Sequence, residues 1–484
     1  MTRERTRGAI TPRWLCYCLL AAAAFLIPRR AAAEKVLTII DGWEVFTDGR
    51  VAGFVSGAYG DGYPQSDYAP DASGIYRPID TPQEGGGFRS VSKQGLVLDQ
   101  SSMGGPTIYD QGKINLWRVR SGFISNVFGF GARTHVAENI AVSAYVQFWA
   151  FVENNGRQKN LPNYPDARQG YGKLEGPWGS LIVGRTRGLF SRGATDIDVM
   201  YAHRWGVGWP GKLDNNGPTL GMLGFGVLGS GFSSGIVYGT PVQGGLHLDV
   251  GLFDPVQLQG SGSWTRTGFL QPQAEMTFDR SFGSGFWAGR VVLFGNGAYQ
   301  KVYKDAYCAP ILDPATMKNI PCDATILGAG YGGRFELGPL HLGVAGHYGR
   351  GLGLFYALEA SDAAQDKEGN LRIISGTYVQ AQVVIRKVDL FAGWGIAQVY
   401  LTDYDKKFKS QDPRDPNNPA AQVFPFSVPK DQIGMNAGIV YNMTPSLHFD
   451  LDFFRAQADW YPVNGFAGQR QVVWVSNGGM TVSW

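Results

Sequence analysis

The sequence predicts an all-β fold, a sixteen-stranded antiparallel transmembrane β-barrel. Three observations favour this fold: long segments alternate apolar and polar residues, short turns alternate with long loops, and no run of 18 apolar residues follows the first 33 residues. A sheet in lipid must close on itself, because lipid cannot satisfy the backbone groups of an open edge. The chain has 68 glycines and 13% aromatic residues, and both contents are high for a soluble enzyme.

The strands alternate with a period of two residues. In residues 447–453, leucine and phenylalanine alternate with His448, Asp450 and Asp452, and residues 246–252, 272–279 and 433–441 show the same pattern. In a membrane barrel the apolar set faces lipid and the polar set faces water. A soluble β-sandwich or propeller would place the polar face outside and would need a second layer against the apolar face. Repeated carboxylates on one face therefore favour the barrel.

The connections divide into two classes. The first strand is expected at 51–59, followed by a long loop over 60–112 that is rich in Gly, Pro, Asp and Ser. Eight long loops and seven short turns join sixteen strands, and this asymmetry is typical of barrels with short periplasmic turns and long extracellular loops. The short turns are expected at 137–139, 176–179, 241–245, 282–285, 337–339, 386–388 and 443–446. The other long loops are expected near 153–167, 187–230, 254–268, 300–325, 350–374, 400–430 and 456–470.

Residues 1–33 are expected to be a cleaved signal peptide. Basic residues precede a short apolar run at 14–27, and Ala31-Ala32-Ala33 offers a cleavage site before Glu34. The barrel domain is then 34–484. Loss of the arginine-rich leader makes the formal net charge slightly negative, so nothing in the charge favours a nucleic-acid partner. The remaining cysteines, Cys308 and Cys322, share one predicted loop and are expected to form a disulfide in an exported protein.

Three segments resemble the general porin superfamily of Gram-negative outer membranes. Residues 168–198 combine the sequence RQGYGKL, the turn Gly176-Pro177-Trp178-Gly179, a strand that leads into Gly184-Arg185 and a charged loop, like the fourth and fifth strands and the third loop of porins. Residues 128–148, FGFGARTHVAENIAVSAYVQF, resemble the second and third strands. The last strand, 471–484, ends in an aromatic residue like the C-terminal recognition strand of outer-membrane proteins, although that residue is Trp484 and not the more frequent Phe.

This resemblance implies a homotrimeric channel in the cell outer membrane for passive diffusion of small hydrophilic solutes and ions. The implied partners are outer-membrane lipid, lipopolysaccharide and, through the last strand, the barrel-assembly machinery. In such porins the third loop, here near 187–230, folds inward and its carboxylates face arginines on the wall. Arg185 shares its strand face with Leu181 and Val183, so a bulge or the strand end would have to turn it inward. The candidate constriction residues are Arg118, Arg120, Arg185, Arg187, Arg192, Asp196, Asp198 and Asp214.

Three other functions remain open from the sequence. A sugar- or anion-selective porin would carry aromatic residues along its lumen, and Tyr145 and Trp149 have the required parity but are too few to form such a path. A plugged structural barrel would carry no current. An outer-membrane enzyme would need a Ser–His pair near the rim, and the G-x-S-x-G match at 231–235 lacks the expected strand–helix context. The histidines are scattered along the sequence, so we expect no metal site. We also expect no enzyme activity and no cofactor.

Overall fold

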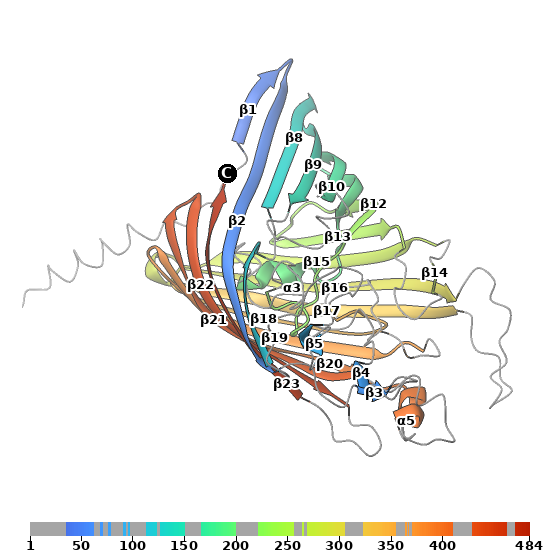
Figure 1. The fold of residues 1–484 in the computed structure, drawn as a ribbon. Helices are drawn as coiled ribbons and strands as arrows, with labels where there is room; N and C mark the ends of the chain where they lie inside the picture. Colours follow the sequence, from blue (N-terminus) through green and yellow to red (C-terminus); the bar gives the residue numbers. More distant parts are fainter. Residues whose placement is uncertain are drawn as a thin grey trace, which may run out of the picture.

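The chain forms a closed sixteen-strand antiparallel barrel (Figure 1). The structure, a computed structural model, describes residues 35–61, 68–70, 76–78, 91–92, 95–96, 113–122, 126–150, 166–199, 221–255, 264–265, 269–304, 323–354, 364, 366, 370–409, 428–461 and 470–484. The barrel closes where β2 pairs with β23. The wall strands are β2 (Trp43–Asp61), β7 (Lys113–Arg120), β8 (Asn126–Ala137), β9 (Ile140–Ala150), β10 (Asp166–Gly176), β11 (Gly179–Arg187), β12 (Phe232–Gly239), β13 (Leu246–Phe253), β15 (Gln271–Phe282), β16 (Gly289–Lys304), β17 (Asp323–Leu337), β18 (Leu340–Arg350), β19 (Ile373–Ile385), β20 (Val388–Tyr400), β21 (Pro429–Thr444), β22 (Leu447–Trp460) and β23 (Arg470–Ser483).

Strands β7 and β8 share one position in the wall, which gives sixteen positions in all. Strand β8 pairs with the first part of β2, over Glu44–Arg50, and β7 pairs with the second part, over Phe54–Asp61. Short elements lie outside the wall positions: β1 (Lys35–Ile40), β3 (Tyr68–Pro70), β4 (Tyr76–Pro78), β5 (Val91–Ser92), β6 (Gly95–Leu96), β14 (Trp264–Thr265), η3 (Gly285–Trp287), α3 (Arg192–Ile197) and α5 (Asp403–Lys409). No helix among the described residues is long and apolar enough to cross a membrane.

The predicted alternation of the strands is confirmed. On β22, Leu451 and Phe453 are 46% and 54% exposed and point outward, whereas Asp452 between them is 1% exposed and points inward. The same contrast holds on β13, where Leu248 and Val250 lie on the outer surface and Asp249 faces the interior. An outer apolar face and an inner polar face are what a barrel in lipid requires.

The N-terminal hairpin differs from the prediction, which began the first strand at residue 51. Strand β2 begins at Trp43, and β1 pairs with it through a two-residue turn at Asp41 and Gly42. Both turn residues have positive φ, as the tight turns of β-hairpins require. Trp484 exchanges two backbone hydrogen bonds with Gly49, in the middle of β2. The start of β2 and all of β1 therefore project past the end of the last strand (Figure 1).

The barrel interior contains an apolar core as well as polar side chains. Residues of the third loop, which we define as 188–231, form this core with inward residues of the wall. Its members include Ile197 and Phe225 from the loop and Phe294, Phe391 and Phe454 from β16, β20 and β22. Inward apolar residues on these strands thus fix the loop against one side of the wall.

Candidate functional site

The third loop enters the barrel directly after β11. The Gly188 amide donates to the Gly231 carbonyl at 2.8 Å and closes the base of the loop. Leu189 and Phe190 follow and are 0% and 1% exposed, so the chain turns inward at once. The structure describes the two limbs of the loop, 188–199 and 221–231. Figure 1 shows α3, in the first limb, inside the ring of strands.

Helix α3 is seated closely against the wall. Gly193 is required there, because a Cβ at this position would clash with the ring of Phe294 on β16. Ala194 and Ile197 are also buried on this side of the helix. The Ser191 hydroxyl donates to the Leu228 carbonyl at 2.8 Å and so joins the first limb to the second. The loop is consequently a packed layer on the wall.

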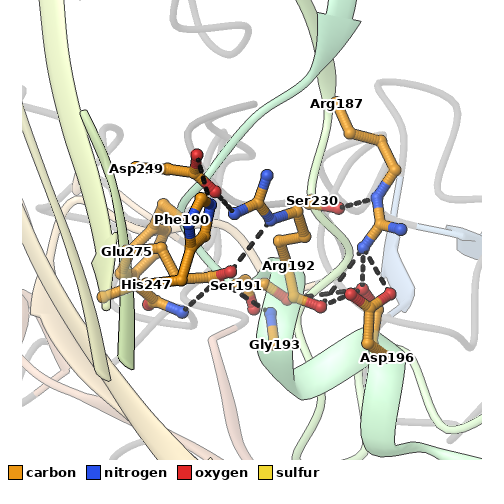
Figure 2. Close-up of polar contacts among 12 residues, drawn as sticks. Arg187, Phe190, Ser191, Arg192, Gly193, Asp196, Ser230, His247, Asp249 and Glu275 are labelled. Atoms are coloured by element: carbon orange, nitrogen blue, oxygen red, sulfur yellow. Dashed lines mark hydrogen bonds and ion pairs between the residues drawn. The ribbon is translucent and has the colours of Figure 1, made fainter. Parts of the chain in front are cut away.

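Arg192 anchors the start of α3 to the wall through two carboxylates (Figure 2). Its Nε donates to Glu275 Oε1 on β15 at 2.9 Å, and its Nη2 is ion-paired with Asp249 on β13. Burial works against the charged guanidinium, but the two carboxylates outweigh it and raise the Arg192 pKa above its usual value. The arginine therefore stays cationic, and its charge is neutralised by the wall.

Glu275 connects further groups to the same anchor. Its Oε2 accepts hydrogen bonds from the Gly193 amide at 3.0 Å and from Asn296 Nδ2 at 3.3 Å. On the same strand, Gln273 Oε1 accepts from the Phe190 amide at 2.8 Å. Glu275 is only 2% exposed, so loss of these partners would leave a buried charge without compensation.

Asp196 and Arg187 form the accessible charge pair of the loop. Arg187 Nη2 donates to Asp196 Oδ1 at 2.8 Å and to Thr195 Oγ1 at 2.8 Å, and its Nε donates to Ser230 Oγ at 3.2 Å (Figure 2). The Asp196 side chain is 52% exposed and that of Arg187 is 22% exposed. Of the loop carboxylates described, Asp196 is thus the one that water inside the barrel reaches.

Asp198 anchors the end of α3 and does not line the water-filled interior of the barrel. It is 2% exposed, and its Oδ1 accepts from the Tyr378 hydroxyl on β19 at 3.1 Å. Next to it, Gln380 Oε1 accepts from the Val199 amide at 2.6 Å, and Gln380 Nε2 donates to the Ile197 carbonyl. The helix is therefore fixed at both ends to the wall.

The second limb packs farther around the same wall. The Phe225 ring meets Phe454 of β22 edge-on, with centroids 5.2 Å apart. Gly226 has φ +100°, and a Cβ there would clash with the Thr377 carbonyl of β19. The described limbs together cover the inner face from β13 to β22.

Arg185 lies on the outer face of the barrel, which corrects its assignment to the constriction. It is opposite Gly170 in an unbroken β10–β11 register, so no bulge turns it inward. It is exposed, and its Nε donates to the Arg168 carbonyl at 3.2 Å. Arg185 therefore lies on the same face as Val183, as strict alternation predicts, and not on the inner face that the porin resemblance implied.

Of the other candidate constriction residues, Arg118 and Arg120 lie on β7 and Asp214 lies in the third loop. Arg118 is opposite Ser56 and Arg120 is opposite Phe54 across β7 and β2. Ser56 points inward and is 1% exposed, so Arg118 occupies an inward position. Asp214 and the pair Cys308 and Cys322 lie outside the described residues, and the disulfide stays a prediction.

The charge arrangement partly reverses the one that the porin resemblance implies. A wall arginine was expected to face loop carboxylates, but the loop-borne Arg192 is bound by wall carboxylates Asp249 and Glu275. Sequence alternation had placed both carboxylates on the inner face, but nothing in it marked them as partners of the loop. Tyr378 and Gln380 were not identified at all. Among the described residues, no group of three or more His, Cys, Asp and Glu side chains could hold a metal ion.

The fold resembles outer-membrane porins of known structure. The outer-membrane channel DcaP of Acinetobacter baumannii aligns with a TM-score of 0.58 and 10% identity, over 93% of this chain and 100% of that chain. An anion-selective porin from Comamonas acidovorans aligns with a TM-score of 0.50 and 11% identity, over 91% of this chain and 100% of that chain. No protein-family model and no curated protein sequence matches the chain.

Proposed function

We propose that the protein is a porin-type channel of the outer membrane that lets small hydrophilic solutes diffuse passively. The observation that carries this proposal is the third loop, which is packed along one inner wall and presents the Arg187–Asp196 pair to water. A loop seated in this way narrows a barrel and leaves a passage beside it. The likeness to DcaP and to the Comamonas porin supports the same function.

The passage lies along the wall that the described limbs of the loop leave uncovered. Inward side chains of β9 and β10, such as Tyr145, Gln147 and Lys173, are half-buried, whereas Tyr378 and Gln380 under the loop are buried. Solutes would therefore pass between α3 on one side and β9 and β10 on the other. Selection would come from the width of this passage and from the charges that line it.

The proposal includes the assembly expected from the sequence. The chain would be exported with residues 1–33 removed, would be inserted through its last strand and would form a homotrimer. It would carry no cofactor, and a disulfide between Cys308 and Cys322 would close one long loop. Trimeric assembly is testable by the mass of the detergent-solubilised protein before and after heating.

Single-channel recording in a planar lipid bilayer tests the function directly. We expect stepwise increases of conductance in potassium chloride, in groups of three if the protein is a trimer. A correctly folded barrel, verified by its heat-dependent gel mobility, that inserts without conductance would contradict the proposal. Such a result would favour a plugged structural barrel.

A further inference from the structure

Two tyrosines form an aromatic surface on the part of the wall that the described limbs of the third loop leave uncovered. Tyr145 of β9 and Tyr171 of β10 are direct partners in the register of the two strands. Their ring centroids are 5.6 Å apart, with 44° between the ring planes, and both side chains are half-buried. Phe46 of β2 supports the surface from the side, with its ring 6.3 Å from that of Tyr145 and only 11° from parallel, and it is buried under the Arg133 guanidinium.

Glycines on the intervening strand make this surface possible. Strand β8 lies between β2 and β9. A Cβ at Gly129 would clash with the Tyr145 hydroxyl, and one at Gly131 would clash with the Phe46 ring. The two rings therefore lie along the wall over glycines and meet across β8. The half-buried Tyr145 ring, lying along the wall, presents one face to the lumen as an apolar platform for a flat solute.

Hydrogen-bonding groups border the platform. Asp48 accepts from the Tyr145 hydroxyl at 2.8 Å, and Gln147 Nε2 donates to the same hydroxyl at 3.0 Å. Gln169 Nε2 donates to Gln147 Oε1 at 3.1 Å. Gln147 Oε1 also accepts from Trp149 Nε1 at 3.0 Å, so both of its lone pairs are used. Each carboxamide nitrogen carries a second N–H and a carboxylate accepts several bonds, so donors of the two glutamines and lone pairs of Asp48 retain capacity for a solute.

The basic side chains of β8 and β10 that border the platform are ion-paired. Each contacts a carboxylate on β2 or β10, and Asp48 adds a further carboxylate beside Tyr145, so the platform gives an anion no net attraction. These pairs are Arg133–Glu44, Arg168–Asp166 at 2.8 Å and Lys173–Glu175 at 2.6 Å.

We propose that five residues form a binding site for a small carbohydrate, which is an uncharged polyhydroxylated solute. These residues are Tyr145, Tyr171, Gln147, Gln169 and Asp48. The flat C–H face of a pyranose ring packs on a tyrosine ring, and its hydroxyls exchange hydrogen bonds with carboxamides and a carboxylate. An anion would gain little at this site, because its basic neighbours are already ion-paired and Asp48 is itself a carboxylate. This inference rests on the proposed channel function and names its substrate class.

Sugar block of the open channel tests the inference, with maltose as the probe. We expect maltose to reduce the single-channel current reversibly and in a saturable way. Tyr171→Ala should raise the half-blocking concentration about three- to tenfold, since an aromatic contact contributes roughly 0.5–1.5 kcal/mol. Tyr331→Ala is the matched control, because Tyr331 lies on the outer face of β17 and is 58% exposed. It should leave the block unchanged.

The outcomes separate this inference from the function on which it rests. Conductance that maltose does not reduce, or equal changes of the half-blocking concentration in the two tyrosine variants, would overturn the proposed carbohydrate site. Either result would leave the proposed channel function intact. Saturable block by succinate with none by maltose would overturn the carbohydrate site in favour of an anion site. A folded barrel without conductance would instead overturn the proposed channel.

Discussion

At the scale of single residues, Asp196 and Asp198 show how position decides the role of a charge. They are two residues apart on α3 and its end, yet the Asp196 side chain is 52% exposed and Asp198 is 2% exposed. Asp196→Asn removes a negative charge that water reaches and leaves the cationic Arg187 beside it. We expect the reversal potential in a salt gradient to shift toward anion selectivity.

Asp198→Asn is the matched control for this prediction. An asparagine oxygen can still accept from the Tyr378 hydroxyl, so the loop should stay in place. Because Asp198 is shielded from the passage, its loss should move the reversal potential much less. Equal shifts for the two variants would show that Asp196 has no special access to the ion path.

The outward position of Arg185 leads to a further residue-scale prediction. Its side chain is on the outer face of β11, separated from the lumen by the wall. Arg185→Ala should therefore leave ion selectivity unchanged, whereas Arg118→Ala, at an inward position opposite Ser56, should shift it toward cations. Reversal potentials of both variants, measured in the same gradient, check this contrast.

At the scale of elements, the third loop depends on the Arg192 anchor. Arg192→Met leaves Glu275 and Asp249 without their cation, and breaking a buried ion pair on one side costs about 3–5 kcal/mol. We expect the loop to leave its seat part of the time, which would appear as increased open-channel current noise. Adding Glu275→Gln removes the buried charge and should reduce that noise, because removing both partners is less costly than removing one. Equal noise in the single and double variants would contradict this role of the anchor.

The elements also show what a sequence can and cannot predict. Strand faces and short turns were predictable, since alternation and turn residues are local signals. The β1–β2 hairpin was missed, although its Asp-Gly turn at residues 41–42 is such a signal. The partners of Arg192 lie 57 and 83 residues away in the chain, and no local pattern relates them. Likewise, the burial of Asp198 depends on which side of a six-residue helix meets β19.

At the scale of the whole molecule, the barrel is closed by the seam between β2 and β23. Trp484 contributes two backbone hydrogen bonds to Gly49, and its ring packs 5.8 Å from that of Phe128. Each such hydrogen bond contributes roughly 0.5–1.5 kcal/mol, and the aromatic packing adds a similar amount. Strand β1 pairs, among the described residues, only with β2 beyond this seam.

These contacts predict opposite results for two terminal deletions. Removing Trp484 should lower the fraction of protein that refolds to the heat-modifiable barrel and should lower its unfolding temperature. Removing residues 35–40 should have little effect on the refolded fraction or on the unfolding temperature, because the β2–β23 register over Arg50–Gly60 remains intact. Gel mobility with and without heating, after refolding into detergent, measures both quantities. If loss of β1 were as damaging as loss of Trp484, closure would depend on the projecting hairpin as well as on the seam.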